Sequence, residues 1–364
     1  MKKIYHALGF MSGTSGDGVD SSIIRSDGLD YNMIEFNCFN PYPAIISDEI
    51  HRITEKINDS SDLLKFSNEI TALEKKLTKF HAEIANKLVQ KLRVDIIGFH
   101  GQTIFHDAEK KISRQIGLGQ ELSKVTKRIV VFDFRQNDLK NNGEGAPLTP
   151  IYHQTLIKQL LKIGKVKVPV TILNIGGIAN ITNIEKDLEI SSMDVGPGNC
   201  LIDKWMRKNS DKFIDKNGDV AKLGKIDKFI LEQYLDNFYY SKISKQKSLD
   251  INDFDISFAK GLSLENGAAT ITELTAEILS KKLKNKDIYI CGGGRKNKFL
   301  VKLLKNKVSR NINLIDSLDI DGDFVESQAF AFLAIRSYLG LPISFPNTTG
   351  CTKPISGGVV AKNF

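Results

Sequence analysis

The sequence predicts an α/β protein built from two halves, and three observations carry that prediction. Helical and strand patterns alternate along the chain, which is typical of an α/β fold. Two segments, beginning at Tyr5 and Val168, each run from an apolar strand through a glycine-containing loop into a second strand. The 364 residues also suit two domains at about 100–200 residues each.

The first half opens with strands at 5–10 and 19–25, separated by a polar loop at 11–18. The loop joins two strands and lacks a Gly-Lys-Ser/Thr ending, so it is not a Walker phosphate loop. Residues 60–92 carry one apolar stripe at steps of three and four, which predicts a helix whose N-cap chemistry comes from Ser60, Ser61 and Asp62. Strands follow at 95–99 and 129–134.

The second half is predicted to contain strands at 168–174 and 178–184, a mostly helical stretch to residue 283, and a strand at 287–291. A helix is predicted at 325–339. We expect residues 1–135 to form the first lobe and residues 136–340 the second. The tail, residues 341–364, is a candidate to return to the first lobe.

Composition narrows the function classes. The net charge is +8, but only ten of the 51 basic residues are arginine and the lysines are spread along the chain, which favours a solvated surface over a nucleic-acid reader. No stretch is long and apolar enough to predict a signal peptide or a membrane span. Four scattered cysteines without a Cys-x-x-Cys pair indicate reduced thiols in the cytoplasm.

The loop at 12–20 is the first candidate site. Its glycines allow main-chain N–H groups to form an anion-binding nest, and its hydroxyls add donors. Asp17 and Asp20 could stand behind a phosphate-bound Mg²⁺, an ion that prefers oxygen ligands and retains waters. The alternative is a plain β-hairpin turn, which Asp-Gly often forms, and the two interpretations are about even from this loop alone.

Other candidates follow strand ends. Asp194 beside a glycine turn could act as a general base, although an Asx-turn is the commoner role for such a residue. Gly292–Gly294 could lie against a ring or a ribose, or could simply connect a strand to a helix. His100 and Gln102 suit a polar substrate better than a metal, and His106 reads as a buried structural histidine.

Together these segments resemble the anhydro-N-acetylmuramic acid kinases. Nine motifs occur in family order over nearly the whole chain: Met11-Ser12-Gly13-Thr14-Ser15-x-Asp17-Gly18-x-Asp20, His100-Gly101-Gln102-Thr103, Asp133-Phe134-Arg135, Gly145-Ala146-Pro147-Leu148, Asn174-Ile175-Gly176-Gly177-Ile178-Ala179-Asn180, Asp194-x-Gly196-Pro197-Gly198-Asn199, Cys291-Gly292-Gly293-Gly294, the segment Glu326 to Ala334, and Asn347-Thr348-Thr349-Gly350.

The resemblance implies a two-lobed actin-like (ribonuclease H-like) ATPase fold with a central cleft for ATP. It implies a reaction in which water opens the 1,6-anhydro ring of anhydro-N-acetylmuramic acid and ATP phosphorylates O6. N-acetylmuramic acid 6-phosphate and ADP would be the products, as part of cell-wall recycling. It also implies a cytoplasmic homodimer.

Carried over residue by residue, the resemblance implies roles for three sets of residues. Asp194 matches the catalytic base. The expected ATP-binding residues are Gly13, Thr14, Ser15, Gly16, Asp17, Gly18, Val19, Asp20, Gly176, Gly177, Gly292, Gly293 and Gly294, with Mg²⁺ near Asp17 and Asp20 through water. The expected sugar-binding residues are Ser12, His100, Gln102, Arg135 and Glu326.

Two departures from the family keep alternatives open. Gly16 stands where the family usually has Leu, and Asp107-Ala108 follows His106 where a proline is usual. A kinase of the same fold that acts on a different sugar is therefore one alternative. A non-catalytic ATP-binding regulator is the other, although no helix-turn-helix or peptide-binding domain is apparent.

Overall fold

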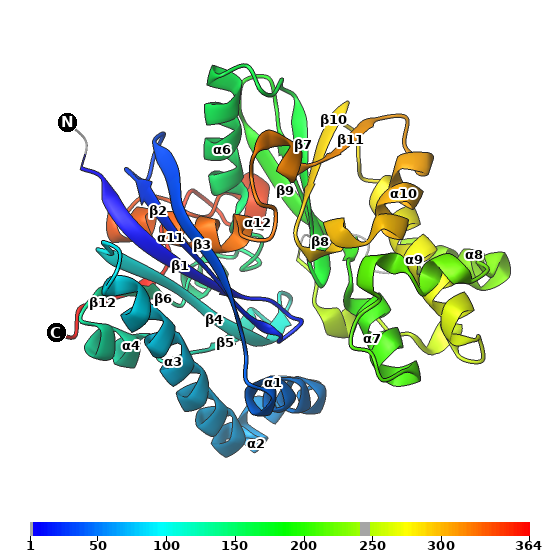
Figure 1. Ribbon diagram of the computed structural model, residues 1–364, viewed down its shortest axis with the longest axis horizontal. Coiled ribbons are helices and arrows are strands. Elements are labelled where there is room, and N and C mark those ends of the chain that lie inside the picture. The colour runs from blue at the N-terminus through cyan, green and yellow to red at the C-terminus, as the bar shows by residue number, and fades with distance from the viewer. Residues whose placement is uncertain (1–2, 241–247) are drawn as a thin grey trace. The chain divides into compact units, whose positions relative to one another are not determined.

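The computed structural model describes residues 3–240 and 248–364, and its contacts divide the chain into two units (Figure 1). Unit 1 comprises residues up to Val166 together with Phe324–Phe364, and unit 2 comprises Lys167–Asp323. This division differs from the predicted one after residue 135. Residues 136–166 and 324–340 belong to unit 1 because their helices pack on each other and on the first sheet.

Unit 1 is organised around one mixed sheet in the order β12-β6-β4-β1-β2-β3, with β5 beside β4. The predicted strands at 5–10, 19–25 and 95–99 are confirmed, whereas the strand predicted at 129–134 ends two residues early, where Asp133 takes a left-handed φ of 57°. The tail pairs with β6 through β12. The strands are β1 Tyr5–Ser12, β2 Gly18–Ser26, β3 Asn32–Pro41, β4 Ile96–Asp107, β5 Ile112–Ile116, β6 Ile129–Phe132 and β12 Val359–Ala361.

The helix predicted over residues 60–92 is two helices, which corrects that prediction. Phe66 separates them: its N–H bonds the carbonyl of Asp62, the first residue of α2, and its own carbonyl accepts the N–H of Ile70 at the start of α3. Its ring packs on the core, which fixes the break. The helices of unit 1 are α1 Ala44–Lys56, α2 Asp62–Lys65, α3 Ser67–Val89, α4 Gly119–Thr126, α5 Gln136–Lys140, α6 Pro150–Lys162, α11 Val325–Tyr338 and α12 Pro346–Thr349.

Strand alternation gives the central strands two different faces. Leu8 and Phe10 of β1 face the core that α1 and α3 complete, while the intervening Gly9 faces α11. A Cβ on Gly9 would lie 2.0 Å from the carbonyl oxygen of Ser327. Glycine is therefore required here, because α11 lies directly on the strand and brings its first turn to the end of the sheet.

Unit 2 repeats the same sheet topology. Its spatial order is β11-β10-β7-β8-β9, which corresponds to β6-β4-β1-β2-β3 in unit 1. Along the chain, the first three strands of each set pair antiparallel, and the last two add in parallel beside the first strand. This duplicated topology is that of the actin-like, ribonuclease H-like fold, and the predicted fold class is confirmed. The strands are β7 Val170–Ile175, β8 Ile178–Ile184, β9 Ile190–Pro197, β10 Asp287–Cys291 and β11 Asn311–Leu314.

Helices cover one face of this second sheet. Apolar residues of β7, β8 and β10 pack against α9 and α10, and a second cluster around the buried Trp205 joins α7, α8 and α9. Every helix in the described part of the chain lacks the apolar length that a bilayer span requires. The helices are α7 Cys200–Asn209, α8 Lys228–Tyr240, α9 Leu264–Ser280 and α10 Lys298–Lys307, with 3-10 turns η1 Lys216–Gly218, η2 Ala221–Leu223, η4 Ile251–Asp253, η5 Ser257–Ala259, η6 Gly293–Lys296 and η7 Ile315–Leu318.

Buried histidines make unit 1 sensitive to acid. Burial lowers the pKa of His81 to about 4 and the pKa values of His100, His106 and His153 to about 3. The same rings titrate near 6.5 in an unfolded chain. As pH falls through about 6, only the unfolded state takes up these protons, so each histidine removes about 1.4 kcal/mol of stability per pH unit.

We expect His81→Phe to flatten this pH dependence. The ring of His81 lies among Phe10 and Phe99, and its Nε2 has no hydrogen-bond partner in the described structure. A phenyl ring keeps the packing and cannot be protonated, so the loss of the urea midpoint between pH 7 and pH 5 should be smaller than in the wild type. Half-exposed His51→Gln is the control. Parallel pH profiles for wild type and His81→Phe would contradict the explanation.

Candidate active site

The loop between β1 and β2 is held in one conformation by hydrogen bonds from its neighbours. Ser47 donates to the carbonyl of Gly16 (2.7 Å), and the N–H of Tyr42 donates to the carbonyl of Asp17 (2.9 Å). Gly16 itself lies at φ +60°, a conformation that glycine adopts without strain. Gly16, which stands where the family usually has Leu, therefore occupies a left-handed turn that is anchored from outside the loop.

The predicted ATP-binding residues of this loop differ in exposure. Thr14 and Asp17 are exposed, and the hydroxyl of Ser15 donates to the Asp17 carboxylate at 2.6 Å. Val19 is instead fully buried in the core of unit 1, so its side chain is unable to contact a nucleotide. Only main-chain atoms of Val19 remain for the predicted role.

Ser12 and Gln102 are brought together by the pairing of β1 with β4. Both are buried, and their side chains are hydrogen-bonded to each other. Tyr42 donates its hydroxyl to Ser12 at 2.9 Å, and Gln102 donates to the carbonyl of Gly13 at 3.1 Å. These two predicted sugar-binding residues therefore also fix the start of the loop between β1 and β2.

His100 and Arg135 form a second polar contact of unit 1. His100 Nδ1 donates to the carbonyl of Gly101 (2.9 Å), which leaves Nε2 to accept from the Arg135 guanidinium (3.1 Å). Burial, and then the Arg135 charge, lower the pKa of His100 to about 3, so the ring is neutral at physiological pH. The ring also packs on Phe330 of α11, with centroids 4.4 Å apart.

Glu326 is placed near this contact by helix geometry. It lies in the first turn of α11, four residues before Phe330, and positions four apart share a helix face. His106 is buried and bonds Ser113 at 2.9 Å, in keeping with the structural role predicted for it. Unit 1 thus pairs Ser12 with Gln102 and His100 with Arg135, and it carries Glu326 on the first turn of α11.

In unit 2, three glycine segments meet around Asn199. The N–H of Asn199 donates to the carbonyl of Gly176 at 2.8 Å, and that of Gly198 donates to the carbonyl of Gly177 at 2.9 Å. The side chain of Asn199 also lies against Gly294, and in the described part of the chain it is the only group within 4 Å of a Cβ built on Gly293. Gly176 and Gly293 therefore present open main chain, which suits the close approach of a ligand.

Asp194 ends a row of polar residues across the second sheet. Strand register places Cys291, Asn174, Asn180 and Asp194 opposite one another on four neighbouring strands, on the face away from α9 and α10. Asp194 is buried and its Oδ2 accepts the N–H of Leu249 at 2.8 Å. Asn180 Oδ1 is buried without a partner in the described structure, which leaves an acceptor for a bound water or ligand.

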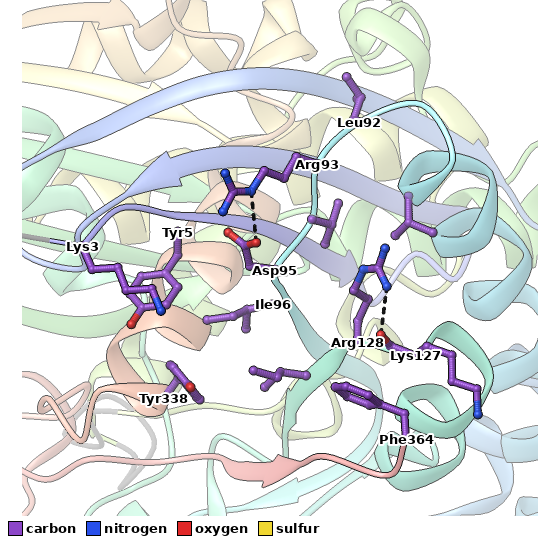
Figure 2. Close-up of a pocket in the computed structure, with 13 residues that line it drawn as sticks. Lys3, Tyr5, Leu92, Arg93, Asp95, Ile96, Lys127, Arg128, Tyr338 and Phe364 are labelled. Carbon is purple, nitrogen blue, oxygen red and sulfur yellow. Dashed lines mark hydrogen bonds and ion pairs between the residues drawn. The ribbon is translucent and has the colours of Figure 1, made fainter.

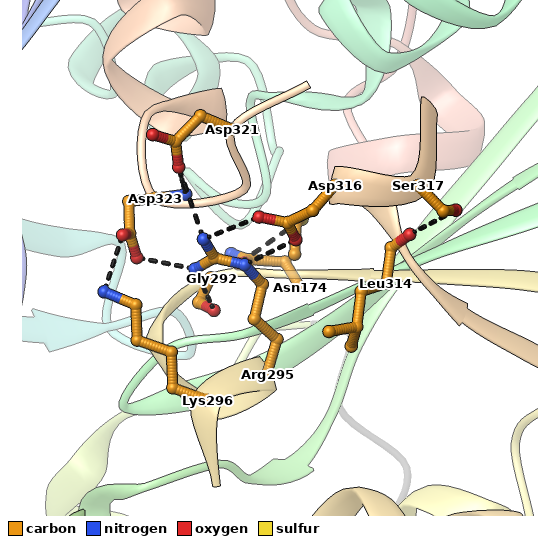
Figure 3. A network of polar contacts seen from close by, with 10 residues as sticks. Asn174, Gly292, Arg295, Lys296, Leu314, Asp316, Ser317, Asp321 and Asp323 are labelled. Carbon is orange, nitrogen blue, oxygen red and sulfur yellow. Dashed lines mark hydrogen bonds and ion pairs between the residues drawn. The ribbon is translucent and has the colours of Figure 1, made fainter. Parts of the chain in front are cut away.

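A charged network holds the predicted Gly292–Gly294 loop in place (Figure 3). Arg295 is buried; it bonds Asp316 through two nitrogens (2.8 and 3.0 Å) and reaches Asp321 (3.3 Å) and Asp323 (2.5 Å). Burial alone would lower the pKa of the Arg295 guanidinium, but the bonds to Asp316 and Asp323 outweigh it and raise that pKa. The guanidinium also donates to the carbonyl of Gly292 at 3.2 Å.

Comparison with known proteins identifies the family. The sequence profile of the family described as "AnmK: Anhydro-N-acetylmuramic acid kinase" matches residues 5–363. The chain belongs to the anhydro-N-acetylmuramic acid kinase family. Relatives of that name are 48% identical in Pelagibacter ubique, with both chains covered fully, and 38% identical in Rhodospirillum rubrum, where the match spans 97% of this chain and 93% of the relative.

The match to the anhydro-N-acetylmuramic acid kinase family confirms two predictions, the family and the enzyme class. The chain is a sugar kinase, a phosphotransferase, and the family supports the predicted use of ATP. A full-length match at this identity does not favour the alternatives of a different sugar or a non-catalytic regulator.

Sequence reasoning missed four residues that organise these groups: Tyr42, Asn180, Asn199 and Arg295. Asn180 and Asn199 are the last residues of two of the nine motifs. The position of each beside a glycine turn was the signal that could have identified them. Tyr42 and Arg295 act through partners 21 or more residues away along the chain, so local spacing held no signal for them.

Proposed function

We propose that the chain uses water to open the 1,6-anhydro ring of anhydro-N-acetylmuramic acid and transfers the γ-phosphoryl group of ATP to O6. The observation that carries this proposal is the buried Asp194, held by a main-chain N–H at the end of a polar row beside the glycine turns of unit 2. A buried carboxylate with a fixed orientation is suited to general-base chemistry.

In the proposed mechanism, Asp194 takes a proton from a water whose oxygen bonds the anomeric carbon C1. The bond between C1 and O6 breaks, and O6 bonds the γ-phosphorus as the bond to the β-phosphate oxygen breaks. The products are N-acetylmuramic acid 6-phosphate and ADP, and the proton leaves Asp194 for solvent. Positioning and charge stabilisation provide most of the catalysis in such a transfer.

The phosphates are proposed to bind main-chain N–H groups of Gly13–Gly18, and the nucleoside to bind the open glycines of unit 2. Mg²⁺ prefers oxygen ligands, and the Asp17 and Asp20 carboxylates supply such donors within one hairpin. No group of three or more His, Cys, Asp or Glu residues is placed to hold a metal in the described ranges, so water and phosphate would complete the shell. When bound, Mg²⁺ neutralises developing phosphate charge.

The sugar is proposed to contact Ser12, His100, Gln102, Arg135 and Glu326. Arg135 is the cation of this set, and N-acetylmuramic acid carries a carboxylate on its lactyl group, which a guanidinium binds well. Neutral His100 orients that guanidinium through Nε2. We further propose a cytoplasmic homodimer; light scattering of the purified protein tests the oligomeric state.

Mass spectrometry of the sugar tests the reaction. After incubation with anhydro-N-acetylmuramic acid, ATP and Mg²⁺, we expect a product heavier by one water and one phosphoryl group. In ¹⁸O water, one heavy oxygen should appear in the sugar and none in the phosphoryl group, because O6 comes from the substrate. Unlabelled product incubated alone in ¹⁸O water controls for exchange at C1.

Two results would overturn the proposal. Heavy oxygen in the phosphoryl group would show that water, not O6, attacked ATP. Phosphorylation of plain hexoses with an unchanged anhydro sugar would support the alternative acceptor and direct attention to Gly16 and the loop after His106.

A further inference from the structure

Unit 1 has a cavity at one end of its sheet, and the loop between β1 and β2 lies at the other end. Strands β1, β4 and β6 begin side by side, and residues at their starts line a cavity of about 500 Å³ (Figure 2). Small-molecule sites occupy roughly 300–1,000 Å³. Because the eight residues of β1 rise about 3.3 Å each, this cavity is over 20 Å from Ser12 at the other end of the strand.

The lining combines apolar and aromatic surface. Leu92, Val94, Ile96 and Ile129 contribute aliphatic side chains. The rings of Tyr5 and Tyr338 meet edge to face with centroids 5.7 Å apart, and both line the cavity. Such a surface suits a ligand that carries a ring, since a bare inorganic ion would gain nothing from it.

The charges around the cavity are strongly unbalanced. Lys3, Arg93, Lys127 and Arg128 line it, and Asp95 is the one acidic side chain among the lining residues. Both oxygens of Asp95 are already engaged, one by Arg93 Nε (3.2 Å) and the other by the N–H of His6 (2.9 Å). Among residues 3–240 and 248–364, no carboxylate lies within ion-pair distance of Lys3, Lys127 or Arg128, which leaves three uncompensated positive charges.

Lys127 and Arg128 are held at the cavity by the end of a helix. The N–H of Lys127 bonds Ser123 at 3.0 Å and the residue caps α4 in a left-handed conformation, while Arg128 Nη1 donates to the Lys127 carbonyl at 2.9 Å. This main-chain bond orients the guanidinium without neutralising it. The Arg128 guanidinium is thus oriented on one side of the cavity, next to the exposed Lys127.

We propose that this cavity binds a small phosphate monoester that carries a ring. A phosphate monoester bears about two negative charges at pH 7 and accepts several hydrogen bonds, which matches neighbouring cations that lack carboxylate partners. A ring attached to the phosphate would pack on the tyrosine and aliphatic side chains. Sugar phosphates and nucleoside monophosphates share this chemistry, and the inference does not depend on the proposed catalytic function.

Calorimetry on the full chain tests the proposal, with ADP present in saturating amount to fill the ATP site. Glucose 6-phosphate and uridine monophosphate are the two probes, and the tighter one identifies the source of the ligand. We expect saturable binding of at least one ester. The double variant K127Q/R128Q should weaken it by about tenfold or more, and ADP affinity should remain unchanged. The double variant K75Q/K79Q removes two exposed lysines of α3 and should bind as the wild type does.

Several outcomes would overturn the proposal. Failure of both esters to bind would remove the site, and equal weakening in the two double variants would show diffuse attraction to a basic protein. Inorganic phosphate that binds as tightly as the esters would remove the role of the ring. A short oligonucleotide that binds the wild type more tightly than either ester, and binds K127Q/R128Q more weakly, would indicate a nucleic-acid surface instead.

Discussion

Replacement of Asp194 by Asn should lower kcat by about 10³-fold while leaving the dissociation constant of ATP nearly unchanged. The substitution keeps the size of the side chain and an oxygen that accepts the Leu249 N–H, so the local structure should persist. It removes the ability to take a proton from water, and general-base groups contribute about 10²–10⁴-fold to rate. Steady-state turnover and binding of a fluorescent ATP analogue measure the two quantities.

The matched control is Asp211→Asn, which removes one carboxylate of unit 2 from an exposed position. This variant should turn over as the wild type does. If Asp194→Asn kept its turnover within about fivefold, Asp194 would not be the base and the polar row would need another role. A simultaneous loss of ATP binding would instead point to local unfolding around β9.

Local sequence patterns predicted the fold well where each element carries its own signal. The strands at 178–184 and 287–291 have the predicted bounds, because each is an apolar run that ends at a glycine turn or a charged residue. Strand β3 was not predicted, since its residues alternate between half-buried and exposed and include polar side chains along an edge. The break at Phe66 was also missed, because the apolar stripe continues through it.

The division into units depends on tertiary packing that no local pattern records. Helix α11 lies more than 200 residues after the strands it covers, and Gly9 and Gly98 permit that contact. The site residues also differ in whether a local sequence pattern could identify them. Asp194 and the glycine loops lie in recognisable motifs, whereas the alignment of Asn180 with Asp194 depends on a register shift between Ala179 and Asn180.

Replacement of Arg295 by Gln should raise the dissociation constant of ATP by about tenfold or more. Arg295 joins the Gly292–Gly294 loop to Asp316, Asp321 and Asp323, and the N–H of Gly292 bonds the carbonyl of Gly322 at 3.0 Å. Without the guanidinium, three carboxylates face one another, and Lys296 still pairs with Asp323. Their repulsion should separate the loop from the Asp316–Asp323 segment, although solvent screens part of it because the three carboxylates are 29–48% exposed.

Variants of the same network separate positioning from general destabilisation. Arg295→Lys keeps the charge but loses the two-nitrogen contact with Asp316, so its ATP affinity should lie between those of the wild type and Arg295→Gln. Lys296→Gln removes an exposed cation that pairs with Asp323 and should change affinity little. The KM for the sugar should stay constant throughout, because the residues proposed to bind it belong to unit 1. If Arg295→Gln lowered the melting temperature but left ATP affinity within about twofold, the network would stabilise unit 2 without positioning the glycine loop.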